Sequence, residues 1–292
     1  MAPEVTARAL LGPRARLEER PGEPLFSVPG EAVAELAAAL DCSLRRAEVR
    51  ALEAGYVPRR YLRNMAEFSL AEQAALLRAR GLLVGLGGLG GFVLDGLVRA
   101  GFGRLAVCDP DRFEESNLNR QVLCTRGDIG RSKAAAAADH AYDVNPAVEV
   151  TMVPGRFEAG ADGLPDQPDL RAALENARVA VDALGGLDEA DGRAALGRAA
   201  ALARVPLVSA GAAGMAGWVA TVPPGGPVPA DFMGGGSGGA ELRLGTPAPA
   251  VALAAAVQVA EILALGCGRT PALLGRVLLF DLTAGSFETV TL

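Results

Sequence analysis

Short apolar runs alternate with helix-compatible segments along most of this chain. The candidate strands lie at 82–84, 104–108, 148–153 and 179–181. The candidate helices between them lie at 91–100, 134–142 and 170–177. Strands that alternate with helices are typical of parallel sheets, because parallel neighbours need a crossover connection. We therefore predict an α/β fold, built on a Rossmann-like, doubly wound and mostly parallel sheet.

The last third of the chain adds elements of other kinds. Two further strands are predicted at 206–209 and 217–222, an alanine-rich helix at 246–265, and a terminal hairpin at 277–292. The connection at 223–245 is rich in glycine and proline, so we expect a flexible crossover rather than a packed element.

The first 56 residues have a different character from the rest. Residues 1–24 mix Pro, Arg and Glu with few large apolar groups, which predicts a loosely attached tail. Apolar residues at helical spacing in 31–40 and 43–54 predict two short helices. We expect a flexible tail and small helical region over 1–56, followed by one large domain over 57–292.

A glycine-rich turn lies between the first strand of the large domain and its helix. It reads Gly85-Leu-Gly87-Gly88-Leu-Gly90, and the next strand ends in Asp109. Glycines allow a tight turn and close approach of a phosphate, while the N–H groups at a helix start point at the anion. An acidic residue roughly twenty positions downstream is typical of ribose recognition. Together these features predict a nucleotide site.

The segment after Asp109 indicates which nucleotide chemistry to expect. It is a polar run that contains Asp111, Asn117 and Arg120, and Lys133 follows before the next helix. Cations that converge on a cradled phosphate suit nucleotidyl transfer, because they stabilise charge on the α-phosphate and on departing pyrophosphate. A simple dehydrogenase would leave this run without a purpose.

The combined motifs resemble the ThiF/MoeB/HesA family, the bacterial relatives of ubiquitin-activating enzymes. The resemblance rests on the glycine turn, Asp109-x-Asp111, the run Ser-Asn-Leu-Asn-Arg-Gln that ends at Gln121, and Lys133, and it extends over 57–292. It implies that ATP and Mg²⁺ are used to adenylate the C-terminal carboxylate of a small ubiquitin-like sulfur-carrier protein ending in Gly-Gly. It also implies a homodimer, with 57–292 as its adenylation domain.

The resemblance assigns roles to individual residues. It implies catalytic roles for Arg120, Lys133 and Arg63, the last reaching the triphosphate of the neighbouring subunit. It also implies a set of nucleotide-binding residues. They are Gly85, Gly87, Gly88, Gly90, Asp109, Asp111, Asn117, Arg120 and Lys133.

One position departs from the family pattern. Relatives have the sequence Asp-x-x-Asp-Asn at the end of the strand predicted at 179–181, and its second aspartate helps hold Mg²⁺. This chain has Gly185 at the position of that second aspartate. Glycine offers no oxygen ligand for a hard cation. Asp182 remains as the candidate metal ligand, with Asp188 and Asp191 as alternatives from a shifted turn.

Composition narrows the remaining possibilities. The net charge of −6 argues against broad nucleic-acid binding. The four cysteines are widely separated, so no zinc site is expected. The run at 246–260 is shorter than the roughly twenty apolar residues that span a membrane, and the start lacks a signal-peptide pattern. We expect a cytoplasmic protein without a membrane partner.

Three alternatives to sulfur-carrier activation, of the thiamine or molybdopterin type, stay open. The first is a tRNA-modifying relative of the same fold. The second is a peptide-modifying enzyme, whose region before residue 57 would clamp a leader peptide. The third is a nucleotide-binding protein without catalysis, which Gly185 suggests.

Overall fold

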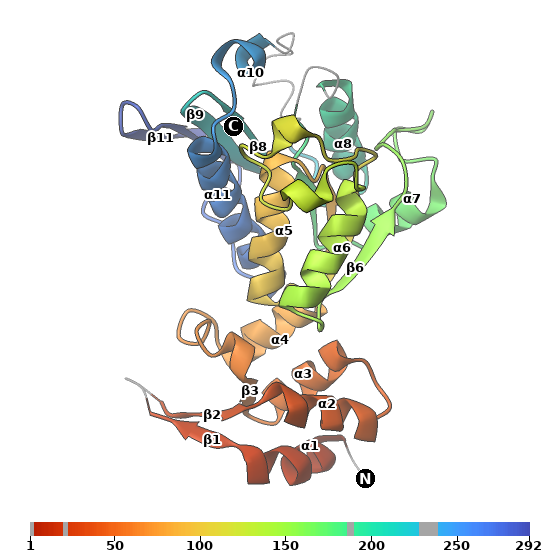
Figure 1. The fold of residues 1–292 in the computed structure, drawn as a ribbon, viewed down its shortest axis with the longest axis vertical. Coiled ribbons are helices and arrows are strands. Elements are labelled where there is room, and N and C mark those ends of the chain that lie inside the picture. The colour runs from red at the N-terminus through yellow and green to blue at the C-terminus, as the bar shows by residue number, and fades with distance from the viewer. Residues whose placement is uncertain (1–2, 20–22, 186–189, 228–238) are drawn as a thin grey trace.

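The computed structural model describes residues 3–19, 23–185, 190–227 and 239–292. Residues 228–238 of the glycine-rich crossover predicted at 223–245 therefore lie outside the described residues, and so does Asp188. Figure 1 shows a large sheet with helices on its faces and, at the lower end, a smaller N-terminal unit that runs from α1 to β3.

The large sheet has eight strands in the order β11-β10-β9-β8-β7-β4-β5-β6. From β8 to β6 neighbouring strands are parallel, whereas β9, β10 and β11 join antiparallel at one side. This arrangement confirms the predicted mostly parallel α/β fold. The strands are β4 (Arg80–Val84), β5 (Arg104–Cys108), β6 (Glu149–Val153), β7 (Val179–Asp182), β8 (Leu207–Ala213), β9 (Ala216–Val222), β10 (Arg276–Asp281) and β11 (Ser286–Thr291).

Helices cover both faces of the sheet because its strands are apolar on both sides. In β4, Leu83 packs into the core under α5 and α11, while Leu82 and Val84 pack into a second core with α7 and α8. The helices are α4 (Leu70–Arg78), α5 (Gly88–Ala100), α6 (Lys133–Val144), α7 (Pro168–Glu175), α8 (Ala190–Leu202), α10 (Gly239–Leu244) and α11 (Ala248–Cys267). Short 3-10 turns η2 (Arg59–Tyr61), η3 (Glu115–Asn117) and η4 (Arg126–Asp128) lie in the connections.

Helix α11 is twenty residues long, which is longer than the apolar run expected at 246–260. By length and composition it is able to cross a membrane, and 44% of the span is buried inside the protein. It packs closely on α5, since a Cβ added at Gly96 would lie 2.8 Å from Cγ2 of Val259. Core packing thus accounts for much of its apolar character.

The N-terminal unit is more ordered than the sequence suggested. The predicted loose tail is wrong for residues 3–18, which form a helix and a strand, and Ala7 and Leu11 are fully buried against Val33 and Leu36. The two apolar residues are four apart and so share one helical face. The unit consists of α1 (Pro3–Leu11), η1 (Gly12–Arg14), β1 (Arg16–Glu18), β2 (Leu25–Val28), α2 (Gly30–Ala39), α3 (Leu44–Glu53) and β3 (Tyr56–Pro58). The domain boundary at residue 56 stays a prediction.

Polar contacts join this unit to the large sheet. Arg45 of α3 is buried and its Nε lies 2.9 Å from Oε1 of Glu149 on β6. The Tyr61 hydroxyl donates to Glu48 of α3 and accepts a hydrogen bond from Asn145, which follows α6. These contacts lie at the end of the sheet where β5 and β6 begin.

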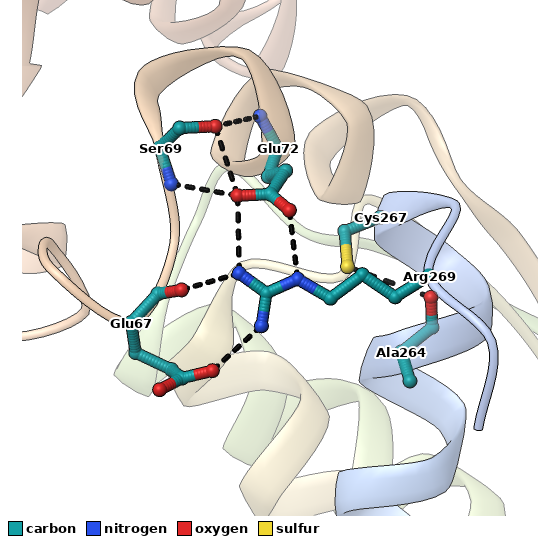
Figure 2. A network of polar contacts seen from close by, with 6 residues as sticks. All are labelled: Glu67, Ser69, Glu72, Ala264, Cys267 and Arg269. Carbon is teal, nitrogen blue, oxygen red and sulfur yellow. Dashed lines mark hydrogen bonds and ion pairs between the residues drawn. The ribbon is translucent and has the colours of Figure 1, made fainter. Parts of the chain in front are cut away.

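Figure 2 shows how α4 and the end of α11 are held together by Arg269. Its Nε donates to Glu72 at 2.7 Å, and its Nη1 donates to Glu67 at 2.6 Å. Glu72 also forms a capping box with Ser69 at the start of α4. Hydrogen bonds from Arg269 and Ser69 lower the pKa of Glu72 to about 2.

Candidate functional site

A cleft of about 640 Å³ opens at the carboxyl ends of the parallel strands. It is lined by the residues that follow β4, β5 and β7, and β4 lies between the other two. The chain reverses its direction across the sheet here, since β5 continues to one side and β7 to the other. Ligands of open α/β sheets bind at such a switch point, and this volume suits a small molecule.

The glycine turn forms one wall of the cleft. Gly85 has a φ of +92°, and a Cβ there would lie 2.6 Å from the Ala183 carbonyl oxygen. A Cβ at Gly90 would lie 1.9 Å from the Gly85 carbonyl oxygen, so this position keeps the turn tight. Gly85, Gly87 and Gly88 line the cleft, with α5 beginning at Gly88. The turn thus presents backbone N–H groups at a helix start to the space.

Asp109 connects the end of β5 to this turn. Its Oδ2 accepts a hydrogen bond from the Leu86 N–H at 2.6 Å, and its Oδ1 accepts one from the Asp111 N–H at 2.8 Å. Each carboxylate oxygen can accept a second hydrogen bond. Asp109 lines the cleft and is therefore placed to accept one from a ribose hydroxyl.

Lys133 begins α6, lines the cleft and is buried. Its side chain is 8% exposed, and its Nζ lies 3.0 Å from Oδ2 of Asp111. The Lys133 N–H also donates to the Asp111 carbonyl, which fixes the two segments to each other. An ammonium group has three donors, so Lys133 can also donate to a phosphate.

The polar run after Asp111 brings three more side chains to the cleft. Asn117 is buried and its Oδ1 accepts from the Glu114 N–H at 3.1 Å, which leaves its amide group near the cleft. Arg120 is partly buried, and its Nη1 donates to the Ser116 carbonyl at 3.0 Å. Gln121 is buried, and its Oε1 has no hydrogen-bond partner among the described residues. A buried acceptor without a partner beside a cleft indicates a ligand contact.

Sequence reasoning missed Gln121 as a site residue, and it also missed Arg156 and Phe157. These two residues follow β6 and line the cleft. A signal was present, because the residues after any parallel strand lie at the same edge of the sheet. The nearby apolar strand had been predicted, so the two positions after it were candidates.

The aspartate predicted as the metal ligand has other partners. Asp182 is fully buried, and its Oδ1 accepts from the Leu184 N–H. Its Oδ2 accepts from the Ser209 hydroxyl at 2.5 Å and lies 3.0 Å from Nε of Arg193. The metal-binding role of Asp182 stays a prediction, and its side chain holds Ser209 and Arg193 at the end of β7.

Gly185 lines the cleft three residues after Asp182. The alternative ligand Asp191 is exposed at the start of α8, and Asp188 lies outside the described residues. Within the described part of the chain, no group of three or more His, Cys, Asp or Glu side chains is arranged to hold a metal. A cation here would need ligands from a second molecule such as a nucleotide.

The two arginines upstream of the glycine turn have different surroundings. Arg60 donates to Asn145 at 2.6 Å and lies 3.2 Å from Glu48, so it belongs to the junction with the N-terminal unit. Arg63 is exposed on the turn after η2. The described residues that line the cleft do not include Arg63 of the same chain. Its role across a dimer interface stays a prediction.

The cleft therefore combines cationic side chains with a glycine turn at a helix start. Among the described residues that line it are Arg112, Arg120, Lys133 and Arg156, which are able to contact an anionic ligand. Asp109 provides acceptors for neutral hydroxyl groups at the same place. This combination is suited to a nucleoside triphosphate.

Comparison with known proteins adds the following. The sequence model of the ThiF family matches residues 61–292. The sulfur carrier protein adenylyltransferase of Thermus thermophilus is 48% identical over 85 residues, which are 29% of this chain and 31% of that protein. The sulfur carrier protein ThiS adenylyltransferase of Escherichia coli is 31% identical over 167 residues, 56% of this chain and 62% of that protein. The chain thus spans less than two thirds of either relative.

Solved structures match a larger part of the chain. Escherichia coli MccB with ATP has a TM-score of 0.66 at 17% identity, and the match covers 97% of this chain and 96% of MccB. The microcin C7 biosynthetic enzyme MccB in complex with N-formylated MccA has a TM-score of 0.63 over the same shares. These likenesses show a shared fold, which extends over the N-terminal unit.

Proposed function

Because this chain belongs to the ThiF family, we propose that it is an ATP-dependent adenylyltransferase that activates the C-terminal carboxylate of a small ubiquitin-like sulfur-carrier protein. The observation that carries the proposal is the cleft in which Lys133 and Arg120 face a glycine turn. The relatives from Thermus thermophilus and Escherichia coli bear sulfur carrier protein adenylyltransferase names, which supports this substrate class.

In the proposed reaction a carboxylate oxygen of the carrier attacks the α-phosphate of ATP. A new oxygen–phosphorus bond forms, the bond to the bridging oxygen breaks, and pyrophosphate leaves with the electron pair. Lys133, Arg120 and Asn117 stabilise charge on the phosphates, and Arg63 of a second subunit adds to them. A carboxylate is already ionised at neutral pH, so the reaction needs no general base.

Magnesium belongs to this proposal as the ion that neutralises the triphosphate when bound. The residues present suit it only in part, because the Asp182 oxygens already accept from Leu184, Ser209 and Arg193. Zinc is not part of the proposal, since the four cysteines are widely separated in the sequence and include no CxxC pair. We place the enzyme in the cytoplasm as a homodimer.

The test is ATP–pyrophosphate exchange with purified protein and candidate carrier proteins that end in Gly-Gly. We expect exchange that depends on the carrier and falls roughly a hundredfold in Lys133→Ala and in Arg120→Ala, the scale of losing one preorganised charge partner. Arg131→Ala is the control, because Arg131 pairs with Asp128 and Asp139 on the surface.

Two outcomes would count against the proposal. Unchanged exchange rates in both cleft variants would show that Lys133 and Arg120 do not act in the reaction. Exchange that no Gly-Gly carrier supports would contradict the proposed substrate class.

A second candidate is activation of a peptide. The observation that favours it is the match to MccB, which extends past the family match into the N-terminal unit and includes a complex with N-formylated MccA. In this candidate the N-terminal unit holds a leader segment while the cleft adenylates the peptide. The same exchange assay with short peptides in place of carriers tests it, and exchange supported by a peptide alone would favour this candidate.

A further inference from the structure

The position that lacks the family's metal-binding side chain has a carboxylate beside it. Among the described residues other than its chain neighbours, a Cβ built at Gly185 would have one contact, the Oε2 atom of Glu241 at 4.0 Å. Glu241 belongs to α10, more than fifty residues further along the chain. A carboxylate oxygen from another element therefore stands next to the space into which a side chain at 185 would project.

Backbone contacts hold Glu241 at this place. The Gly245 N–H donates to the Glu241 carbonyl at 2.8 Å, and the Gly214 N–H donates to the Gly245 carbonyl at 2.8 Å. The second bond joins the end of α10 to the turn between β8 and β9. The position of α10 is thus tied to the large sheet.

Glu241 also lines the same cleft as the phosphate-binding candidates. It is partly buried and shares the cleft wall with Gly87, Lys133 and Gly185. Asp182 is fully buried and holds Ser209 and Arg193. Of these two carboxylates, only Glu241 is recorded in the lining of the cleft among the described residues.

We propose that Glu241 supplies the carboxylate ligand for the magnesium of bound MgATP, from α10 instead of from position 185. The inference rests on the proposed ATP site and deepens it. Magnesium is usually held by one or two carboxylates together with phosphate oxygens and waters, rather than by a cage of protein ligands. A single carboxylate next to a phosphate cradle is sufficient for such a site.

The charge of Glu241 gives the proposal a measurable consequence. Without a cation, a carboxylate beside the triphosphate repels it, whereas a divalent cation between them attracts both. Magnesium should therefore tighten ATP binding in a way that depends on Glu241. Removal of its charge should leave metal-free ATP binding equal or tighter.

The experiment is calorimetric titration of the full chain with ATP, with and without MgCl₂. For the unmodified protein we expect magnesium to tighten binding by about tenfold or more, which corresponds to about 1.4 kcal/mol. Glu241→Gln should lose most of this magnesium effect. Asp169→Asn is the matched control, an exposed carboxylate on the first turn of α7 that should keep it.

A second variant, which moves the carboxylate from position 241 to position 185, distinguishes loss of the metal ligand from damage to the fold. In the double variant Gly185→Asp with Glu241→Gln, the carboxylate returns to position 185, where Glu241 is the one contact of the new Cβ within 4 Å among the described residues other than its chain neighbours. We expect the magnesium effect to return.

The outcomes distinguish this inference from the proposed function. A full magnesium effect in Glu241→Gln, or no magnesium effect in the unmodified protein, would overturn the inference and leave ATP binding intact. Absence of ATP binding to the unmodified protein would overturn the proposed function itself.

Discussion

Glu48 is an acidic side chain buried between the N-terminal unit and the large sheet. It is 1% exposed, accepts a hydrogen bond from the Tyr61 hydroxyl at 2.7 Å, and lies 3.2 Å from Nε of Arg60. Burial raises its pKa to about 7 and outweighs Arg60 and Tyr61, which lower the pKa. The folded protein therefore binds this proton more tightly than the unfolded chain, where glutamate titrates near 4.5.

This shift predicts a pH dependence of stability. The contribution of the Glu48 proton is fully present below about pH 4.5 and is lost as the pH rises through about 7. From pH 5 to pH 8 we expect this group to lower the free energy of unfolding by about 2–3 kcal/mol. Glu48→Gln should lose that part of the pH dependence, measured by urea unfolding at both pH values.

Glu53→Gln serves as the control for this prediction. Glu53 lies on the same helix but is exposed and pairs with Arg50 and Arg78. A pH dependence that is the same in Glu48→Gln and in the unmodified protein would contradict the assignment.

Single residues also show how far sequence reasoning reaches into the site. The glycines, Asp109 and Lys133 were predicted because the motif places them on one strand–turn–helix unit and the segment after it. The partners of Asp182 and the nearness of Glu241 to Gly185 were not predictable. Those contacts depend on how distant elements pack, which a local pattern does not contain.

At the scale of elements, the turn between β4 and α5 depends on Gly90 more than on its neighbour. A Cβ at Gly90 would lie 1.9 Å from the Gly85 carbonyl oxygen. A Cβ at Gly91 would lie no closer than 3.4 Å to its nearest neighbours, which include Cγ of Leu123. The first requires the backbone to move, and the second is an ordinary packing distance. The two positions therefore form a matched pair in one helix.

We expect Gly90→Ala to lower the free energy of unfolding by at least about 3 kcal/mol and to weaken ATP binding. Gly91→Ala should stay within about 1 kcal/mol of the unmodified protein, because alanine favours helix over glycine. Urea unfolding and ATP titration of both variants provide the measurement. Equal stability of the two variants would contradict the role given to Gly90.

Elements with strong local patterns were predicted well, and those that depend on tertiary packing were not. The terminal hairpin of β10 and β11 is confirmed. Helix α1 was missed because its polar and proline-rich surroundings mask two buried residues, Ala7 and Leu11. Those two residues are buried because α2 and α3 pack against them.

At the scale of the whole molecule, the N-terminal unit and the cleft lie at opposite ends of the large sheet. The unit contacts the sheet where β6 begins, at Glu149, and the cleft opens where β4, β5 and β7 end. The predicted fold class and family resemblance are confirmed. No pattern in the sequence indicated where the N-terminal unit packs against the sheet. Its position depends on side chains far apart in the chain.

Asn145 is the central polar residue of that junction. Its Nδ2 donates to the Tyr61 hydroxyl at 2.9 Å and to the Val98 carbonyl at 3.0 Å, and its Oδ1 accepts from Arg60 at 2.6 Å. Asn145→Ala would leave several of these groups buried without partners, at a cost of about 3 kcal/mol. We expect faster amide hydrogen exchange in residues 44–61 and a lower free energy of unfolding.

ATP affinity should remain unchanged in this variant, because the cleft is at the other end of the sheet. Asn176→Ala is the control, since Asn176 is exposed and donates only to the Ala172 carbonyl among the hydrogen bonds described for its side chain. Its removal should change the free energy of unfolding by less than about 0.5 kcal/mol. If Asn145→Ala lowered ATP affinity as well as speeding amide exchange in residues 44–61, the junction and the cleft would be coupled. Helix α6 would connect them, because it begins at Lys133 and ends beside Asn145.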